Sequence, residues 1–197
     1  MMMITGKQII LRDWNEQDLP AYSRWLQPGH EWKRLDAPYY PNPNSDEIRE
    51  IVEDQRNVIE FSDWPAPRQQ LIIANPQTNQ MIGQVSWYWI SEETNWPALG
   101  IVIYDPKHWR QSFGYEALGL WSDYLLQAQP SFVRLDLRTW SGNAGMMRLA
   151  QKLGYREEAR FRNARIVDGR YYDGMGYGIL REEWAARYPQ GFAATLG

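Results

Sequence analysis

Cysteine is absent from this chain of 197 residues, and histidine occurs only twice. The first absence excludes disulfide bonds and thiolate metal sites, and the second leaves little from which to build any metal site. Basic residues are also too few for a phosphate-binding surface, with 21 Lys and Arg against 24 Asp and Glu and a formal charge of −3. They are scattered along the chain rather than clustered. We therefore predict no metal and no nucleic-acid partner.

Long apolar runs are missing from the first twenty residues, which carry charged side chains that include Lys7, Arg12, Asp13 and Glu16. This excludes the apolar segment of a signal peptide and a membrane span there. We expect a cytoplasmic protein with no membrane partner. Nucleotide-binding glycine loops, the serine-hydrolase elbow and clusters of metal ligands are absent as well, so these enzyme classes find no support.

Aromatic residues are abundant, with 11 Trp, 12 Tyr and 5 Phe. Rings bury large areas, so core packing or contact between subunits explains them. A substrate pocket with aromatic walls is the alternative.

The order of patterns predicts one α+β domain over residues 1–197, with a single mixed sheet flanked by helices. Asn15 and Asn44 open two helices as N-caps, each followed three residues later by an acidic residue. Asp168-Gly169 predicts a type I′ hairpin turn. The tail at 189–197 is expected to be loose. Strands are expected at 8–12, 69–74, 80–90, 99–104, 132–139, 157–167 and 170–180.

The central stretch runs from the strand at 99–104 through a loop at 105–114 into a helix that begins near Tyr115. Such a junction presents unpaired backbone N–H groups at the positive end of the helix dipole. It therefore predicts an anion-binding loop.

Three segments carry a resemblance to a known family: Asp105-Pro106, the stretch from Trp109 to Ala117, and Asn143 through Lys152-Leu153-Gly154-Tyr155. They resemble the GNAT superfamily of acyl-CoA-dependent N-acyltransferases, in the branch of the ribosomal-protein and spermidine N-acetyltransferases. The resemblance extends from Ile9 to Leu180. It implies a splayed central sheet and acetyl-CoA as co-substrate.

In the resembled family the pantetheine arm of the cofactor lies between two diverging strands, here 101–104 and 135–139, by β-augmentation. The pyrophosphate lies on the loop. The chain departs from the family pattern at Trp109, where a polar residue is usual, and at Ser112, which replaces a glycine. If Ser112 needs a positive φ, it costs about 1–2 kcal/mol. The implied cofactor-binding residues are Ile103, Tyr104, Trp109, Arg110, Gln111, Ser112, Phe113, Gly114, Tyr115 and Asn143.

The resemblance implies direct acetyl transfer to a small amine, a polyamine or a protein N-terminus. An acceptor of pKa about 10.4 must first lose a proton, which costs on the order of 4–5 kcal/mol at pH 7. We expect Asp36 to hold the ammonium group. The predicted substrate-binding residues are Trp32, Asp36, Tyr39, Tyr40 and Trp87.

The two positions where relatives carry proton-transfer residues are Ala98 and Ala150 here, so the catalytic residues stay unassigned. The remaining candidates are Asp36, Tyr39, Tyr88 and Glu116, although Glu116 also suits the helix dipole. A catalytically silent module that binds or senses acyl-CoA is therefore an alternative, and an aromatic-lined binding protein without CoA is another. The acceptor, the size of the acyl group and the oligomeric state, including a homodimer, stay open.

Overall fold

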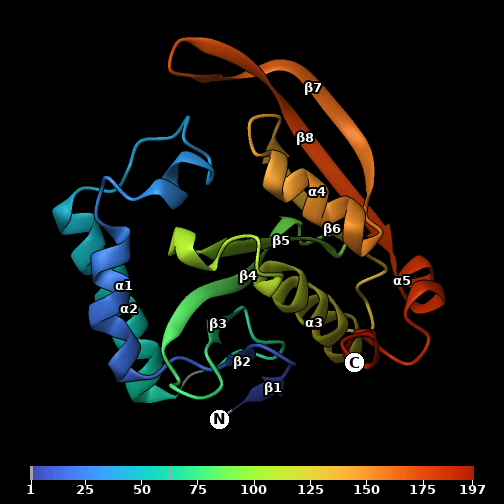
Figure 1. The fold of residues 1–197 in the computed structure, drawn as a ribbon, viewed down its shortest axis with the longest axis horizontal. Helices are drawn as coiled ribbons and strands as arrows, with labels where there is room; N and C mark the ends of the chain where they lie inside the picture. The colour runs from blue at the N-terminus through green and yellow to red at the C-terminus, as the bar shows by residue number, and fades with distance from the viewer. Residues whose placement is uncertain (1, 63) are drawn as a thin grey trace.

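A computed structural model describes residues 2–62 and 64–197 (Figure 1). The strands are β1 (Met3–Thr5), β2 (Ile10–Arg12), β3 (Gln70–Ala74), β4 (Met81–Ser91), β5 (Trp96–Ile103), β6 (Arg134–Trp140), β7 (Arg156–Val167) and β8 (Arg170–Leu180). The helices are α1 (Leu19–Leu26), α2 (Ser45–Phe61), α3 (Phe113–Ala128), α4 (Ala144–Leu153) and α5 (Arg181–Arg187). Short 3₁₀ turns are η1 (Glu16–Asp18), η2 (Glu31–Arg34), η3 (Pro106–His108) and η4 (Phe192–Thr195).

The strands form one sheet in the order β1-β2-β3-β4-β5-β6-β8-β7. Every neighbouring pair is antiparallel except β5 with β6, which is parallel. The predicted α+β class with a mixed sheet is confirmed, although the patterning does not predict β1. No helix in the described parts of the chain is long and apolar enough to cross a membrane.

Local signals in the sequence produce the predicted helix start and hairpin. The Asn44 side chain accepts hydrogen bonds from the N–H groups of Asp46 and Glu47, and Glu47 accepts one from the Asn44 N–H at 2.7 Å. Together they close the capping box of α2. The turn between β7 and β8 has positive φ at both Asp168 (49°) and Gly169 (73°), as a type I′ turn requires.

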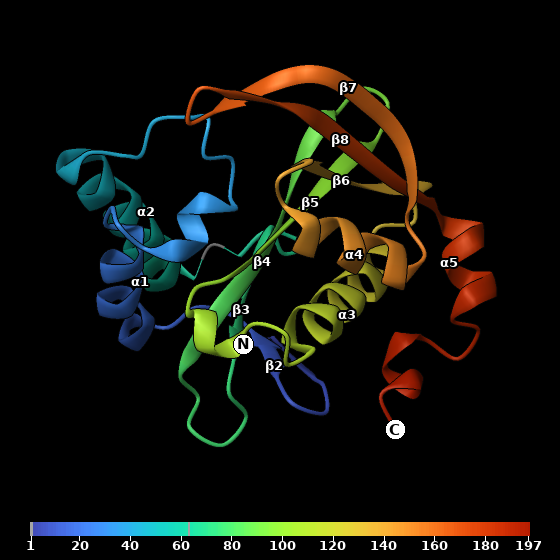
Figure 2. The ribbon, with the colours of Figure 1, turned by 45° about the horizontal axis from the view of Figure 1, so that its top comes forward.

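Both faces of the sheet are covered, and each has its own apolar core. One core lies between the sheet and the helices α3, α4 and α5, and the other lies under α1 and α2. Figures 1 and 2 show the long β7–β8 hairpin extending toward the connection between α1 and α2. The hairpin tip and this connection therefore face each other across one end of the molecule.

The C-terminal tail is anchored, so the expectation of a loose tail at 189–197 is wrong. Phe192 is completely buried, and its N–H donates to Oδ2 of Asp123 in α3 at 2.7 Å. Its ring occupies the space that a side chain at Gly119 would need. Phe192 thus holds the tail against α3 by packing on Gly119. The amino-acid composition of the tail does not reveal this contact.

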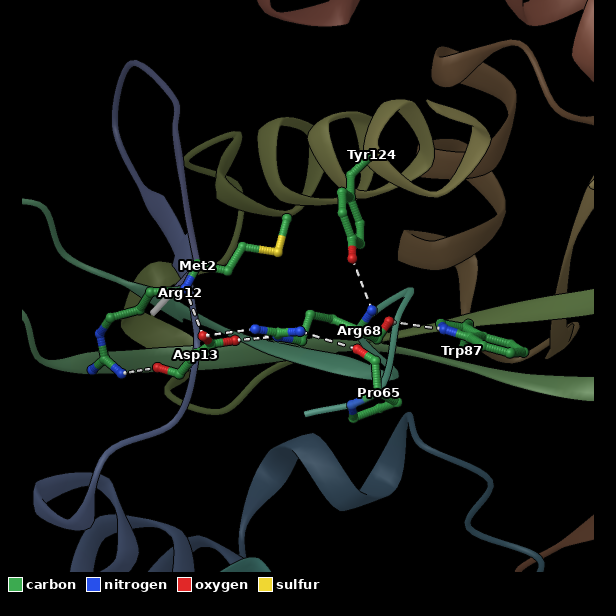
Figure 3. Close-up of polar contacts among 7 residues, drawn as sticks. All are labelled: Met2, Arg12, Asp13, Pro65, Arg68, Trp87 and Tyr124. Atoms are coloured by element: carbon green, nitrogen blue, oxygen red, sulfur yellow. Dashed lines mark hydrogen bonds and ion pairs between the residues drawn. The ribbon is translucent and has the colours of Figure 1, made fainter. Parts of the chain in front are cut away.

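Buried polar contacts tie the N-terminal strands to β3 and α3 (Figure 3). Asp13 is completely buried and accepts from the Met2 N–H at 2.6 Å and from Nε of Arg68 at 2.8 Å. The Arg68 N–H donates to the Tyr124 hydroxyl of α3, and its carbonyl accepts from Nε1 of Trp87 in β4. One arginine thus joins three elements on the side of the sheet away from the divergence of β5 and β6.

Candidate active site

The strands β5 and β6 are joined at only two positions, Ala98 with Asp136 and Leu99 with Leu137. Both strands continue beyond these pairs, β5 to Ile103 and β6 to Trp140. The strands therefore diverge after Leu99, as a splayed sheet requires, and leave two unpaired backbone edges facing each other.

The backbone of β5 points polar groups into this gap. The Tyr104 N–H donates to the Ile82 carbonyl of β4 at 3.0 Å. Because N–H and C=O groups alternate in direction along a strand, those of Ile103 and Ile101 point the other way, toward β6. Nε1 of Trp109 already donates to the Ile103 carbonyl at 2.9 Å. Ile101 therefore offers the free edge against which an extended, amide-containing ligand can lie.

The loop before α3 forms a cradle of backbone N–H groups. Arg110 and Ser112 have positive φ angles of 61° and 66°. Within the described residues, the N–H groups of 111–115 have no hydrogen-bond acceptor in the protein. Unpaired amides at the start of a helix, preceded by left-handed residues, bind phosphate groups well. The geometry therefore fits a diphosphate, as the sequence predicts.

Several residues predicted to bind the cofactor support the loop with their side chains instead. Tyr104 is buried under α1, where its ring stacks on Trp25 at 5.7 Å, so only its backbone is left for the predicted contact with the cofactor, which stays a prediction. Trp109 braces the loop through its bond to Ile103. Tyr115 packs against Phe192 and lies under the ammonium group of Lys152. These rings hold the N–H groups in place.

The connection between α1 and α2 and the tip of the β7–β8 hairpin enclose a pocket of about 930 Å³. Its walls include Trp32, Asp36 and Tyr40 from the connection, Trp140 from β6 and Tyr172 from the hairpin. Three predicted acceptor-binding residues therefore line one pocket. Tyr39 adjoins it, with its ring at 5.0 Å from that of Tyr40.

Asn143 attaches this pocket to α4. Its Oδ1 accepts from the Met146 N–H at 3.0 Å, which caps the helix, and its Nδ2 donates to the Leu35 carbonyl at 3.1 Å. Nε1 of Trp140 donates to the same carbonyl at 3.0 Å. The asparagine predicted to contact the cofactor thus also fixes the connection that carries Asp36.

The prediction that Trp87 contacts the acceptor is wrong. Its side chain lies on the opposite face of β4, where it packs edge-on against Trp89 and Phe132. Tyr88, its neighbour in sequence, points to the pocket face and is 46% exposed. One step along a strand exchanges the two faces of a sheet.

Glu116 has a structural role, so the structure does not support it as a catalytic residue. It is 1% exposed, and its Oε1 accepts from the N–H groups of Gln8 and Ile9 at 2.8 and 3.1 Å. The carboxylate thus faces the β1–β2 turn, away from the divergent strands. Ala150 lies in the core on the buried side of α4. Alanine at this position carries no group that could transfer a proton.

Tyr88 lies at the foot of the divergence. It pairs with Ala98 of β5, which pairs with Asp136 of β6, so all three occupy one row across the sheet. Burial raises the pKa of Tyr88; Arg138 opposes the shift, and Tyr39, Asp136 and Asp36 add to it. Residues from β4, β6 and the α1–α2 connection therefore meet around this hydroxyl.

Asp36 stands at the edge of the pocket, with its side chain reaching solvent. Loss of hydration around the carboxyl raises the pKa of Asp36 above its usual value, and the positive charge of Lys33 opposes that shift. The described residues contain no group of three His, Cys, Asp or Glu side chains that could hold a metal ion.

Arg138 and Asp136 were missed by the sequence reasoning. The available signal was the alternation of polar and apolar residues in Arg134-Leu135-Asp136-Leu137-Arg138, which places three charged side chains on one face of β6. The sequence does not show that these residues lie at the site, because that depends on the position at which β5 and β6 separate.

Comparison with known proteins agrees with this geometry. The family model described as "Acetyltransferase (GNAT) domain" matches residues 8–156. A prophage-derived uncharacterized N-acetyltransferase of Bacillus subtilis is 22% identical over 186 residues, covering 91% of this chain and 94% of the relative.

Solved structures share the fold. A spermidine N-acetyltransferase from Vibrio cholerae, in complex with CoA and spermine, superposes with a TM-score of 0.70 at 19% identity, covering 90% of this chain and 98% of that one. A GCN5-related N-acetyltransferase from Brucella melitensis has a TM-score of 0.71 at 20% identity, covering 100% of this chain and 86% of that one. The predicted enzyme class, an acetyltransferase that uses acetyl-CoA, is thereby confirmed at the level of the family. The chain belongs to the GNAT family of acetyltransferases.

Proposed function

We propose that this protein transfers the acetyl group of acetyl-CoA to the amine of a small molecule or peptide that enters between the α1–α2 connection and the β7–β8 hairpin. The observation that carries the proposal is the divergence of β5 and β6 beside a loop whose N–H groups lack partners in the described chain. One feature receives the pantetheine arm and the other the diphosphate. The predicted cytoplasmic location and homodimer stay predictions.

The chemistry needs a neutral amine, which attacks the thioester carbonyl, and a proton for the thiolate that leaves as the carbon–sulfur bond breaks. Asp36 is placed to hold the acceptor ammonium group and accept its proton. We assign protonation of the thiolate to Tyr88, because it lies in the row at which β5 and β6 part and a tyrosine phenol carries its proton at neutral pH. Both residues adjoin the foot of the divergence.

A silent CoA-binding module is the second candidate, favoured by alanine at positions 98 and 150. Tyr88 in the same row as Ala98 supplies an alternative proton donor.

Two measurements test the proposal. Thermal unfolding should show stabilisation of about 2.7 kcal/mol with CoA at 100 times its Kd, and a panel of amines with acetyl-CoA should release free CoA thiol. Tyr88→Phe should lower kcat at least tenfold, because it removes the proton donor, while leaving CoA affinity unchanged. Tyr171→Phe, an exposed tyrosine on β8, is the matched control. Absence of CoA binding would refute both candidates, and binding without turnover of any amine would favour the silent module.

A further inference from the structure

The pocket face of β6 carries a row of long side chains because β8 offers almost none opposite them. Asp136, Arg138 and Trp140 pair with Gly178, Gly176 and Gly174 of β8. A Cβ at Gly176 would lie 2.9 Å from Nη1 of Arg138. The alternating glycines therefore let the side chains of β6 lie flat over the neighbouring strand.

Arg138 stands where the two strands part. It follows Leu137, the last residue of β6 that pairs with β5. Its side chain shares a face with Asp136, and so with Ala98 and Tyr88. The charge of Arg138 opposes the upward shift that burial gives the pKa of Tyr88, as expected for residues on one face of the sheet.

Arg138 also keeps free hydrogen-bonding capacity. Its Nη2 contacts Oδ2 of Asp136 at 3.2 Å, and its guanidinium lies 5.4 Å from the centre of the Trp96 ring. Among the described residues, its Nη1 and Nε have no hydrogen-bond acceptor. Arg134 differs, because it is engaged by both Asp136 and Glu158. Arg138 is 31% exposed and can accept a further anion.

We propose that Arg138 binds a carboxylate of the acceptor, so that the substrate is an amine carrying a carboxylate group, as in an amino acid. This inference rests on the proposed function. Arginine presents a planar pair of donors that matches a carboxylate. Trp140 lies two residues beyond Arg138 on the same face of β6, and it lines the pocket that also holds Asp36, the residue proposed for the ammonium group. A polyamine has no anion for Arg138 to bind, so this arginine would add nothing to its recognition. The site is therefore built for a molecule with both charges.

Matched acceptor pairs test this proposal: L-phenylalanine, L-methionine, L-glutamate and glycine, each against its α-carboxamide, with spermidine alongside. The wild-type enzyme should use at least one amino acid with a kcat/KM tenfold or more above that of its amide. Arg138→Gln should lower kcat/KM for the acid at least tenfold and leave the amide within about twofold. Arg138→Lys should recover part of the loss, since it restores charge without the planar pair. Arg156→Gln, which removes an exposed arginine from β7, should change neither.

A binding measurement separates this inference from the proposed function. Titration of the same amino acids into the protein saturated with CoA reports recognition without turnover. If no amine is acetylated but the amino acid binds and Arg138→Gln abolishes binding, acetyl transfer fails and the carboxylate site stands. Equal use of acid and amide, a preference for spermidine, or unchanged selectivity in Arg138→Gln overturns the inference. Unchanged CoA affinity of the Arg138→Gln variant shows that the variant is folded.

Discussion

At the scale of single residues, the anion-binding loop contains a residue in a backbone conformation that is unfavourable for any side chain. Ser112 stands at the N-cap of α3 with a φ of 66° and makes no capping bond with its side chain. A residue with a Cβ is strained in this left-handed region, at a cost of about 1–2 kcal/mol. The cradle therefore depends on backbone geometry that the packed rings of Trp109 and Tyr115 help to hold.

Two substitutions at Ser112 separate the backbone from the hydroxyl. Ser112→Gly and Ser112→Ala both remove the hydroxyl, but only glycine relieves the strain. We expect the glycine variant to have a free energy of unfolding about 1 kcal/mol above that of the alanine variant, measured by urea denaturation. Both should bind CoA as the wild type does if N–H groups hold the diphosphate. An equal loss of CoA affinity in the two variants would instead assign binding to the hydroxyl.

At the scale of elements, the strands of the N-terminal half are joined by a buried ion pair as well as by the sheet. Asp13 is buried directly after β2, and Arg68, which precedes β3, donates to its two carboxylate oxygens from Nε and Nη2 (Figure 3). Removal of one partner leaves the other charge without compensation in a site that excludes water.

Asp13→Asn should therefore lower the free energy of unfolding by about 3 kcal/mol. Asp46→Asn is the control, because Asp46 and Arg49 form an exposed pair on α2 whose loss should cost less than about 1 kcal/mol. Chemical denaturation of both variants at neutral pH measures the difference. Similar values for the two would show that the buried contact adds nothing to the sheet.

Contacts between elements also explain why the roles predicted for Trp87 and Glu116 are not found. Trp87 and Tyr88 are adjacent, and the strand pattern places them on opposite faces, but the pattern does not say which face meets the acceptor. Glu116 fits the helix dipole, yet its partners are amides of the β1–β2 turn, a strand pair that the sequence does not predict. Both errors concern contacts between elements far apart in the chain.

At the scale of the whole molecule, buried tyrosines make stability depend on alkaline pH. Burial raises the pKa of Tyr22 to about 12 and also raises the pKa values of Tyr104 and Tyr155 well above the usual value of a tyrosine. The unfolded chain ionises these groups near pH 10 while the folded chain keeps them protonated. Their stabilisation is therefore complete below pH 10 and is lost as the pH rises toward the folded pKa, by about 1.4 kcal/mol per pH unit for each group.

Tyr104→Phe should reduce this slope by about 1.4 kcal/mol per pH unit above pH 10. At pH 7 the variant should be as stable as the wild type or more so, because the buried Tyr104 hydroxyl has no hydrogen-bond partner in the described chain. Urea denaturation at pH 8 to 11 measures the slope. Tyr171→Phe, exposed on β8, should leave it unchanged. A slope unaltered by Tyr104→Phe would contradict the assigned burial of its hydroxyl.

Local chemistry decided much of this molecule without help from tertiary contacts. The capping box at Asn44 and the turn at Asp168-Gly169 each specify backbone geometry within a few residues, so the sequence by itself determined these two features and the α+β order. Only the tertiary structure decided that β5 and β6 part after Leu99, that Phe192 docks on Gly119, and that Arg138 lies on the same face of the sheet as Tyr88. The physical reason is range: dihedral preferences and caps act between neighbours, whereas packing and charge act between residues that only the folded sheet brings together.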